Sequence, residues 1–382
     1  MNVRRTALVT LSLASVVGLA SAQAPAPRPT VQPVQKVAPI APLSPQLSAA
    51  ALKLQPVTAA PQLQSVIAQK QVFDPAKLQG KLTYVGNLPQ LQIKPNKTVV
   101  LEPASEAPPR AVAIDPALRA KLTKYEPHYK AQYFGKARIP KLVEKVVDHK
   151  AWQTPIRDQG PRGTCVAFAS MAGLEWFYKR FQGKTRDLSE NHTYNVFMSK
   201  VGSTCMADPG IKTVDAADFL KAERVCDEPQ SPYVTNKTTA CQTIPPACNV
   251  SKKHGFTITS KFYAPAYGGS GSEVATNTSY LESLVNLGFP VVMGVHVAGT
   301  DWSDGSAESG IVDVQKTGSG QPAPSYGGHA MLLVGYNSTA DYFIFKNSWG
   351  TDGGHDGYYH LSYEYLQTYA KYGYVILGAT NG

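Results

Sequence analysis

The sequence predicts an α+β domain that follows a long, proline-rich leader, and three observations support this fold class. Eighteen of the 29 prolines lie before residue 146, and a chain so rich in proline favours extended conformations that cannot build a core. Apolar residues after Cys165 recur at the spacing of a buried helix. Two apolar runs between residues 329 and 346, separated by a short turn, have the pattern of a β-hairpin.

The net charge of +10 is divided unevenly along the chain. Residues 1–145 hold 19 Lys and Arg against 6 Asp and Glu, whereas residues 146–382 hold 18 against 21. The basicity therefore belongs to the leader, which lacks the interleaved aromatic residues or motif of a nucleic-acid-binding segment, and we expect no nucleic-acid partner. An aromatic content of 9% and 31 glycines are ordinary for a folded protein, which excludes wholesale disorder.

Residues 1–22 have the pattern of an export signal. Arg4 and Arg5 precede an apolar stretch over residues 7–20, and Ala20-Ser21-Ala22 fits a cleavage site with small residues. The alternative, an uncleaved membrane anchor, is disfavoured because the apolar stretch is short for a span. We therefore expect a secreted or periplasmic protein, without stable membrane insertion after signal removal, in a compartment where disulfides persist.

Residues 23–140 form the predicted leader, for which two interpretations remain open. It is either a flexible spacer or a propeptide, whose positive charge complements the mildly acidic domain and which inhibits that domain intramolecularly. Residues 81–85 have the composition of a short strand, and residues 116–136 suggest one short basic helix before Pro127. If the leader is removed, we place the cleavage near residues 135–148.

Cys165 is the candidate nucleophile. Pro161 and Gly163 exclude a helix through the preceding loop, so the buried helix should begin close to Cys165. A thiol at a helix N-terminus meets unpaired N–H groups and the positive end of the helix dipole, both of which favour the reactive thiolate. Gln159 could place its side-chain amide beside the Cys165 N–H and complete a two-donor oxyanion hole. The alternative is a buried structural thiol or half of a disulfide.

His329 and Asn347 supply the partners that a catalytic thiol needs. The predicted hairpin has strands over residues 329–336 and 342–346 and a turn over 337–341, so it brings both residues to one end of the sheet. An imidazole beside a thiol acts as general base and later as general acid, and an Asn side chain can fix its tautomer. Trp349 could cover that bond and exclude water. The alternative for His329 alone is a structural histidine.

At this point the sequence resembles the papain-like cysteine peptidases. Four blocks over roughly residues 140–382 carry the resemblance, namely Pro155-Ile-Arg-Asp-Gln-Gly with Gly163-Thr-Cys-Val-Ala-Phe-Ala, Leu188-Ser-Glu-Asn, Gly328-His-Ala-Met-Leu-Leu-Val-Gly-Tyr, and Phe345-Lys-Asn-Ser-Trp-Gly-Thr with Gly357-Tyr.

The resemblance implies a papain-like fold of two subdomains over residues 141–382, one mainly helical and one β-rich, with substrate between them. It implies Cys165 as nucleophile, His329 as acid and base, Asn347 as its orienter and Gln159 in the oxyanion hole. It also implies substrate-binding roles for three residues, namely Trp349, Gly210 and Gly328. Neither a metal nor an organic cofactor is implied.

The chain departs from the family's pattern at several positions. Arg162 stands where the family usually has a disulfide cysteine, and Val166 replaces the usual tryptophan. The chain has five cysteines, and the four other than Cys165 allow three pairings. The resemblance favours Cys205–Cys241 with Cys226–Cys248. The leader shows no Glu-Arg-Phe-Asn-Ile-Asn propeptide signature.

The leading functional hypothesis is an exported cysteine endopeptidase that hydrolyses peptide bonds in peptide or protein substrates through a thioester acyl-enzyme. A transpeptidase or acyltransferase using the same thioester is the first alternative, and product analysis with an added amine separates the two. A secreted binding module that kept the fold but lost activity is the second. Covalent labelling of Cys165 by a thiol-directed epoxide distinguishes it from an enzyme.

Overall fold

The computed structural model describes residues 72–86, 88–103, 145–242, 256–264, 281–282, 284–286, 288–303 and 309–381. The predicted signal peptide, the helix expected over residues 116–136 and Cys248 lie outside these residues. The described α-helices are α3 (Cys165–Gln182), α4 (Glu190–Lys200), α5 (Thr213–Ala222), α6 (Lys237–Gln242) and α9 (Tyr363–Tyr369). Short 3-10 helices cover Pro75–Leu78, Lys150–Trp152 and Glu228–Gln230.

The helical part of the domain is built on α3, which begins at Cys165 as the apolar spacing predicted. Its first residues are buried almost without interruption, as expected for a helix enclosed by other elements, and it ends at Gly183 in a left-handed conformation with φ 65°. Helix α4 is capped by Ser189, whose hydroxyl accepts the His192 N–H at 3.0 Å. Helix α5 places Ala217 and Leu220 in the same core as α3.

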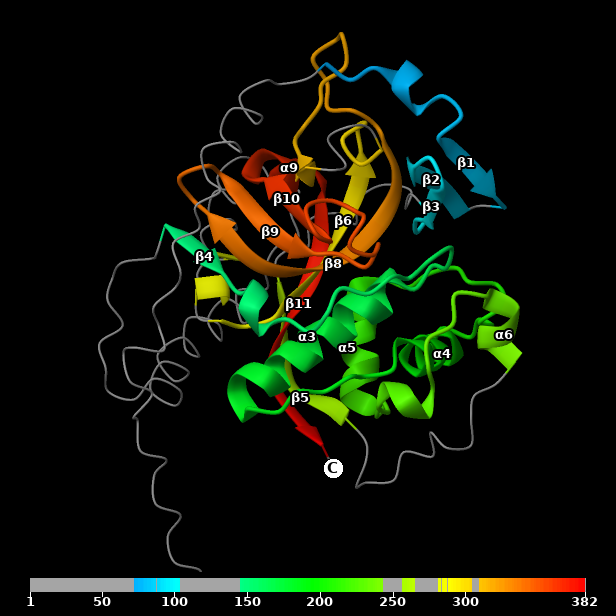
Figure 1. The fold of residues 1–382 in the computed structure, drawn as a ribbon, viewed down its shortest axis with the longest axis vertical. Helices are drawn as coiled ribbons and strands as arrows, with labels where there is room; N and C mark the ends of the chain where they lie inside the picture. The colour runs from blue at the N-terminus through cyan, green and yellow to red at the C-terminus, as the bar shows by residue number, and fades with distance from the viewer. Residues whose placement is uncertain are drawn as a thin grey trace, which may run out of the picture. The chain divides into compact units, whose positions relative to one another are not determined.

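The large sheet has the strand order β5-β11-β6-β8-β9-β10-β7, and β4 pairs with β8 outside this path. Its strands are β4 (Val146–Asp148), β5 (Phe256–Ala264), β6 (Val291–Ala298), β7 (Ile311–Val312), β8 (Ser325–Asn337), β9 (Tyr342–Lys346), β10 (Tyr358–Ser362) and β11 (Ala370–Asn381). In Figure 1 the green helices α3, α4 and α5 lie on one side and the orange strands β8 and β9 on the other.

Strand β8 lies between two hydrophobic cores because successive side chains of a strand point to opposite faces. Leu332 and Val334 join the core that contains α3 and α4, whereas Met331 and Leu333 join the core on the other face. The antiparallel pairing of β8 with β9 confirms the predicted hairpin. These helices and this sheet confirm the predicted α+β fold with a helical and a β-rich part.

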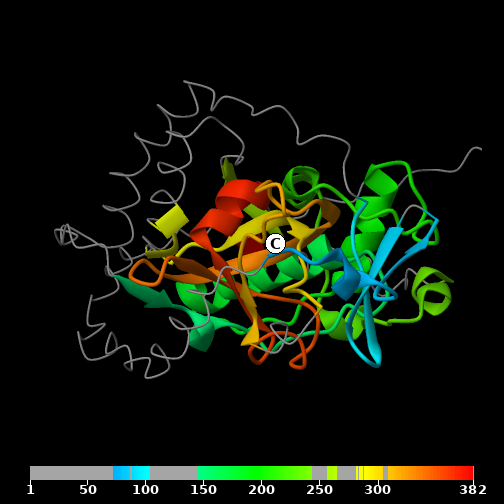
Figure 2. The same cartoon turned by 90° about the horizontal axis from the view of Figure 1, so that it is seen from above.

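Part of the leader is folded onto the β-rich part of the domain. Strands β1 (Leu82–Val85), β2 (Leu88–Lys94) and β3 (Lys97–Val100) form an antiparallel sheet, and β1 confirms the strand expected over residues 81–85. Alternate residues of β2 are buried, and Leu91 and Ile93 join the core that contains Met331 and Leu333 of β8. Lys97 and Asp158 form an ion pair at 2.8 Å. Figure 2 shows β1, β2 and β3 in blue and cyan at one side of the domain.

The cysteines confirm one predicted disulfide. Cys205 and Cys241 are bonded, with their Cα atoms 5.4 Å apart, and Cys165 is a free, buried thiol. Cys226 is also disulfide-bonded, while its predicted partner lies outside the described residues. Arg162 fills the position of the missing family cysteine as a fully buried guanidinium. It donates hydrogen bonds to Asn191 Oδ1 at 3.1 Å and to a main-chain carbonyl at 2.9 Å, so hydrogen bonds hold this loop where a disulfide is absent.

Gly173 sets how closely α3 approaches the sheet. A Cβ at this position would lie 3.2 Å from both Ile376 Cδ1 and Val292 Cγ2 and 3.3 Å from Leu332 Cδ1. We therefore expect Gly173→Val to lower the free energy of unfolding by about 1–3 kcal/mol through overpacking, measured as a lower Tm. Gly318→Val is the matched control, since a Cβ at Gly318 meets nothing within 4 Å. An equal Tm for the two variants would contradict this account of the packing.

Candidate active site

Cys165 occupies the first residue of α3, at the end of a loop that is fixed at several points. The side chain is 1% exposed. The Gln159 N–H donates to the Ser348 carbonyl at 2.8 Å, and the Gly163 N–H donates to Asp208 Oδ2 at 3.1 Å. The loop is thereby anchored both to the strand end that carries Asn347 and to the helical part, so the thiol has a defined position.

His329 and Asn347 are joined as the hairpin predicted. The distance between His329 Nε2 and Asn347 Oδ1 is 2.6 Å, and both side chains are buried. Because a carbonyl oxygen can only accept, Nε2 carries the hydrogen and Nδ1 is left as the basic nitrogen. Nδ1 has no hydrogen-bond partner among the described residues. Burial lowers the pKa of His329 to about 4, and the bond to Asn347 offsets part of this shift, so the imidazole is neutral at pH 7.

Trp349 covers this pair. Its ring stacks on the His329 ring, with centroids 4.4 Å apart and an interplanar angle of 29°. Trp302 and Tyr359 contact Trp349 edge-on, each with a centroid distance of 5.7 Å. The imidazole is therefore held between its hydrogen bond to Asn347 and the stacked Trp349 ring.

Gln159 is completely buried and is held at both ends of its amide. Ser348 donates its hydroxyl to Gln159 Oε1 at 2.7 Å, and Gln159 Nε2 donates to the Arg162 carbonyl at 2.8 Å. Since a primary amide has two N–H groups, the bond to the Arg162 carbonyl uses only one of them. Tyr233 also donates its hydroxyl to the Gln159 carbonyl at 2.7 Å, which fixes the main chain of the same residue.

The leader reaches the thiol through Glu102, a residue that the sequence did not indicate. The Cys165 thiol donates to Glu102 Oε1 at 3.6 Å. The main chain of Glu102 pairs with Gly328 through two hydrogen bonds, N–H to carbonyl at 2.8 Å and carbonyl to N–H at 2.9 Å. The preceding residue, Leu101, is fully buried. It leaves no room for a side chain at Gly327, because a Cβ there would lie 2.6 Å from the Cβ of Leu101.

This contact reverses the expectation that the helix N-terminus keeps Cys165 as a thiolate. Burial raises the pKa of Cys165 well above its usual value, and the neighbouring Glu102 carboxylate raises it further. Hydrogen bonds from the main chain at Ala330 and Val166 offset only part of the shift. In this structure Cys165 is therefore a thiol and the His329 imidazole is neutral, so the two do not form a thiolate–imidazolium pair.

The two glycines predicted to bind substrate both border the Glu102 side chain. A Cβ at Gly210 would lie 3.0 Å from Glu102 Cγ, and one at Gly328 would lie 3.1 Å from Glu102 Oε2. The segment before Gly210 is held by Asp208, whose Oδ1 accepts the Tyr194 hydroxyl at 2.6 Å. Asp208 has a φ of 52°, a left-handed conformation that Asp adopts more readily than most residues other than glycine.

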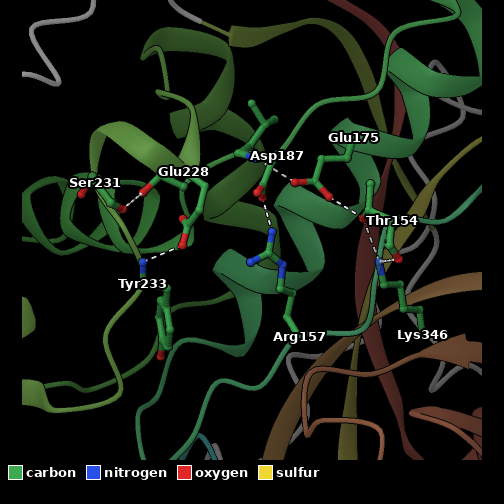
Figure 3. A network of polar contacts seen from close by, with 10 residues as sticks. Thr154, Arg157, Glu175, Asp187, Glu228, Ser231, Tyr233 and Lys346 are labelled. Carbon is green, nitrogen blue, oxygen red and sulfur yellow. Dashed lines mark hydrogen bonds and ion pairs between the residues drawn. The ribbon is translucent and has the colours of Figure 1, made fainter.

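A buried polar network supports the two elements that carry the site, as Figure 3 shows. Glu175 of α3 accepts the Thr154 hydroxyl at 2.5 Å and the Leu188 N–H at 2.8 Å. Lys346, directly before Asn347, donates to the Thr154 carbonyl at 2.8 Å. Burial lowers the pKa of Lys346 to about 8, and the charge of Glu175 opposes this shift. The network thus ties the helix of Cys165 to the strand of Asn347.

Neither a metal site nor a membrane span was found in the part of the chain that the structure describes. No group of three or more His, Cys, Asp or Glu side chains there is arranged to hold an ion. No helix within the same residues is both long and apolar enough to cross a bilayer.

Comparison with known proteins places this geometry in a family. Residues 140–373 match the family model described as papain family cysteine protease. Among curated relatives, a gamete and mating-type specific protein A of Dictyostelium discoideum is 31% identical over 222 residues, which are 56% of this chain and 42% of that protein. A viral cathepsin of a Cydia pomonella granulosis virus is 27% identical over 54% of each chain. The chain thus spans about half the length of the curated relatives it matches.

Two solved cysteine proteases resemble part of this chain. Xylellain, a cysteine protease from Xylella fastidiosa, is 25% identical, with a TM-score of 0.48 over 62% of this chain and 86% of that chain. The ragweed pollen cysteine protease Amb a 11 in its proform is 23% identical, with a TM-score of 0.47 over 62% of this chain and 66% of that chain.

Glu175 allows the supporting network to be tested. We expect Glu175→Ala to lower the free energy of unfolding by about 1–3 kcal/mol, because it leaves the Thr154 hydroxyl and the Leu188 N–H without their buried acceptor. Glu175→Gln retains one acceptor and should cost less. Glu223→Gln is the control, since Glu223 forms a partly exposed ion pair with Lys200. The measurement is chemical denaturation, and a Glu175→Ala curve that matches the control would refute the role of the network.

Proposed function

Because this chain belongs to the papain family of cysteine proteases, we propose that it is an exported endopeptidase that hydrolyses peptide bonds in peptide or protein substrates. Cys165, His329 and Asn347 form the proposed catalytic triad, and Gln159 belongs to the proposed oxyanion hole. The observation that carries the proposal is the His329–Asn347 bond at 2.6 Å, because it fixes a neutral imidazole whose Nδ1 is free to take a proton. The proposed signal over residues 1–22 accounts for export.

The proposed reaction begins when His329 Nδ1 takes the Cys165 proton. The thiolate attacks the carbonyl carbon of the peptide bond, and the Cys165 N–H and the Gln159 amide stabilise the resulting oxyanion. When this intermediate collapses, the C–N bond breaks and the leaving amine takes its proton from the imidazolium. Water, deprotonated by His329, then hydrolyses the thioester and restores the thiol. Asn347 keeps the ring oriented throughout, and Trp349 shields their hydrogen bond.

Substitution of the triad tests the proposal directly. We expect Cys165→Ala to abolish hydrolysis of casein by the protein whose leader has been removed after folding, because no other described cysteine is free. His329→Ala should lower the rate by about 10²–10⁴-fold, the usual contribution of a positioned general base. His355→Ala, at an exposed turn residue, should retain activity. A Cys165→Ala protein that still cleaves casein would overturn the mechanism.

The same proposal assigns residues 23–140 as an inhibitory leader that is removed near residues 135–148. The contact between Glu102 and Cys165 supports this role. So does the core formed jointly by β2, β3 and β8, since Leu91, Val99 and Leu101 lie in one cluster with Met331 and Leu333. A nucleophile that is buried and protonated is not available to substrate. The Lys97–Asp158 pair adds charge complementarity between leader and domain.

Glu102 provides the test of inhibition. In the full-length chain we expect Glu102→Gln to accelerate alkylation of Cys165 by iodoacetamide and to shift the pH profile of alkylation downwards. The reason is that removing the carboxylate removes a negative charge that raises the pKa of Cys165. Mass spectrometry of the labelled protein gives the rates. Glu223→Gln should leave them unchanged, and a Glu102→Gln profile identical to that of the unmodified chain would count against inhibition by this residue.

A further inference from the structure

Lys371 lies beside the space that the Glu102 carboxylate occupies. Its Nζ is 2.7 Å from the position that a Cβ on Gly328 would take, and Glu102 Oε2 is 3.1 Å from the same point. Lys371 belongs to β11, next to β6 and two strands from β8, whereas Glu102 belongs to the leader. An ammonium group from the sheet and a carboxylate from the leader thus border one small space that only a glycine at position 328 leaves open.

The leader enters this space as a bound peptide strand. Glu102 exchanges both main-chain hydrogen bonds with Gly328, at 2.8 and 2.9 Å, which is the pairing by which an added peptide strand is recognised irrespective of its sequence. The Glu102 side chain lies against Gly210, a glycine with a φ of 75°. Any peptide that pairs with Gly328 in this way directs one side chain into the same space, immediately beside the nucleophile.

The groups around that side chain favour a carboxylate. The Cys165 thiol donates to Oε1, the main chain at Ile211 donates a further hydrogen bond, and the positive charge of Lys371 favours the ionised form. Burial raises the pKa of Glu102, and these three groups oppose that shift. The nearby His296 is kept neutral, because burial first and Lys371 second lower its pKa to about 4. Lys371 therefore supplies the positive charge at this position.

We propose that Lys371 determines substrate specificity by selecting an acidic side chain, above all glutamate, at the substrate residue whose main chain pairs with Gly328. In the leader, Glu102 occupies the position that this substrate residue would take. The inference rests on the proposed peptidase function and adds the chemical class of its substrates, namely peptides with Glu or Asp adjacent to or near the cleaved bond.

The first experiment measures specificity in the protein whose leader has been removed after folding, so that a substrate residue, and not Glu102, pairs with Gly328. A positional-scanning peptide library compares Glu, Gln and Lys at each position around the cleaved bond. At one position we expect kcat/KM for Glu to exceed that for Gln about tenfold or more, since a charged partner strengthens a hydrogen bond by that order. Lys371→Met should lower this ratio of Glu to Gln to about one, and Lys371→Glu should make a peptide with Lys at that position the preferred substrate.

Lys184→Met in the same background is the control. Lys184 is exposed and lies just beyond the end of α3, far from the first residue of that helix, so the Glu preference should persist. If the protein cleaves peptides but its ratio of Glu to Gln is unaffected by Lys371→Met, the inference fails while the proposed function stands. If no peptide is cleaved under any condition, the proposed function fails instead.

A second experiment tests the recognition without any turnover. In the full-length chain, Glu102→Lys and Lys371→Glu should each accelerate alkylation of Cys165, because each places like charges at the shared space. The double variant Glu102→Lys with Lys371→Glu restores opposite charges, and we expect it to recover much of the protection. If the effects of the two substitutions on the alkylation rate add, so that the double variant is alkylated faster than either single variant, the proposed role of Lys371 is wrong. This result can be obtained even with an inactive preparation.

Discussion

The close packing of α3 against the sheet is the constraint on which the site depends. Helix α3 carries Cys165 and β8 carries His329, so the two reactive groups belong to different halves of the domain and meet only if those halves dock in one register. Gly173 lets the helix approach Val292, Leu332 and Ile376 with almost no intervening volume. The Glu175–Thr154–Lys346 network then fixes the same helix to the strand that ends at Asn347. Apolar packing sets the distance, and the buried hydrogen bonds set the orientation.

The elements that could be predicted from the sequence are those that local patterns specify. Helical spacing after Gly163 places the start of α3 at Cys165, and two apolar runs with a short turn define the β8–β9 hairpin. Since both ends of a hairpin lie together, the pairing of His329 with Asn347 follows from the same pattern. The Cys205–Cys241 disulfide came from the family resemblance, because spacing alone leaves three pairings open.

The parts that could not be predicted depend on contacts between distant segments. Glu102 lies 63 residues before Cys165, within a leader of weak periodicity, and nothing in its neighbourhood distinguishes it from a surface glutamate. Lys371 likewise reads as an ordinary strand residue. The protonation state of Cys165 was mispredicted for a related reason. The helix N-terminus acts in the direction expected, but burial under the leader and the charge of Glu102 outweigh it, and neither is visible without the docked chain.

In the proposed scheme, a carboxylate side chain at this position takes part in both inhibition and substrate recognition, and the two differ in the group that is presented to the Cys165 thiol. A substrate must present its carbonyl carbon to the thiol, whereas Glu102 presents a side-chain carboxylate, which accepts a hydrogen bond from the thiol and is not an electrophile. The main-chain pairing with Gly328 is common to both. The leader also stays covalently attached, so its local concentration exceeds that of a free peptide competing for the same groups. The thiol bond of 3.6 Å is weak by itself, and it is burial together with the charge of Glu102 that keeps Cys165 protonated while the leader is docked.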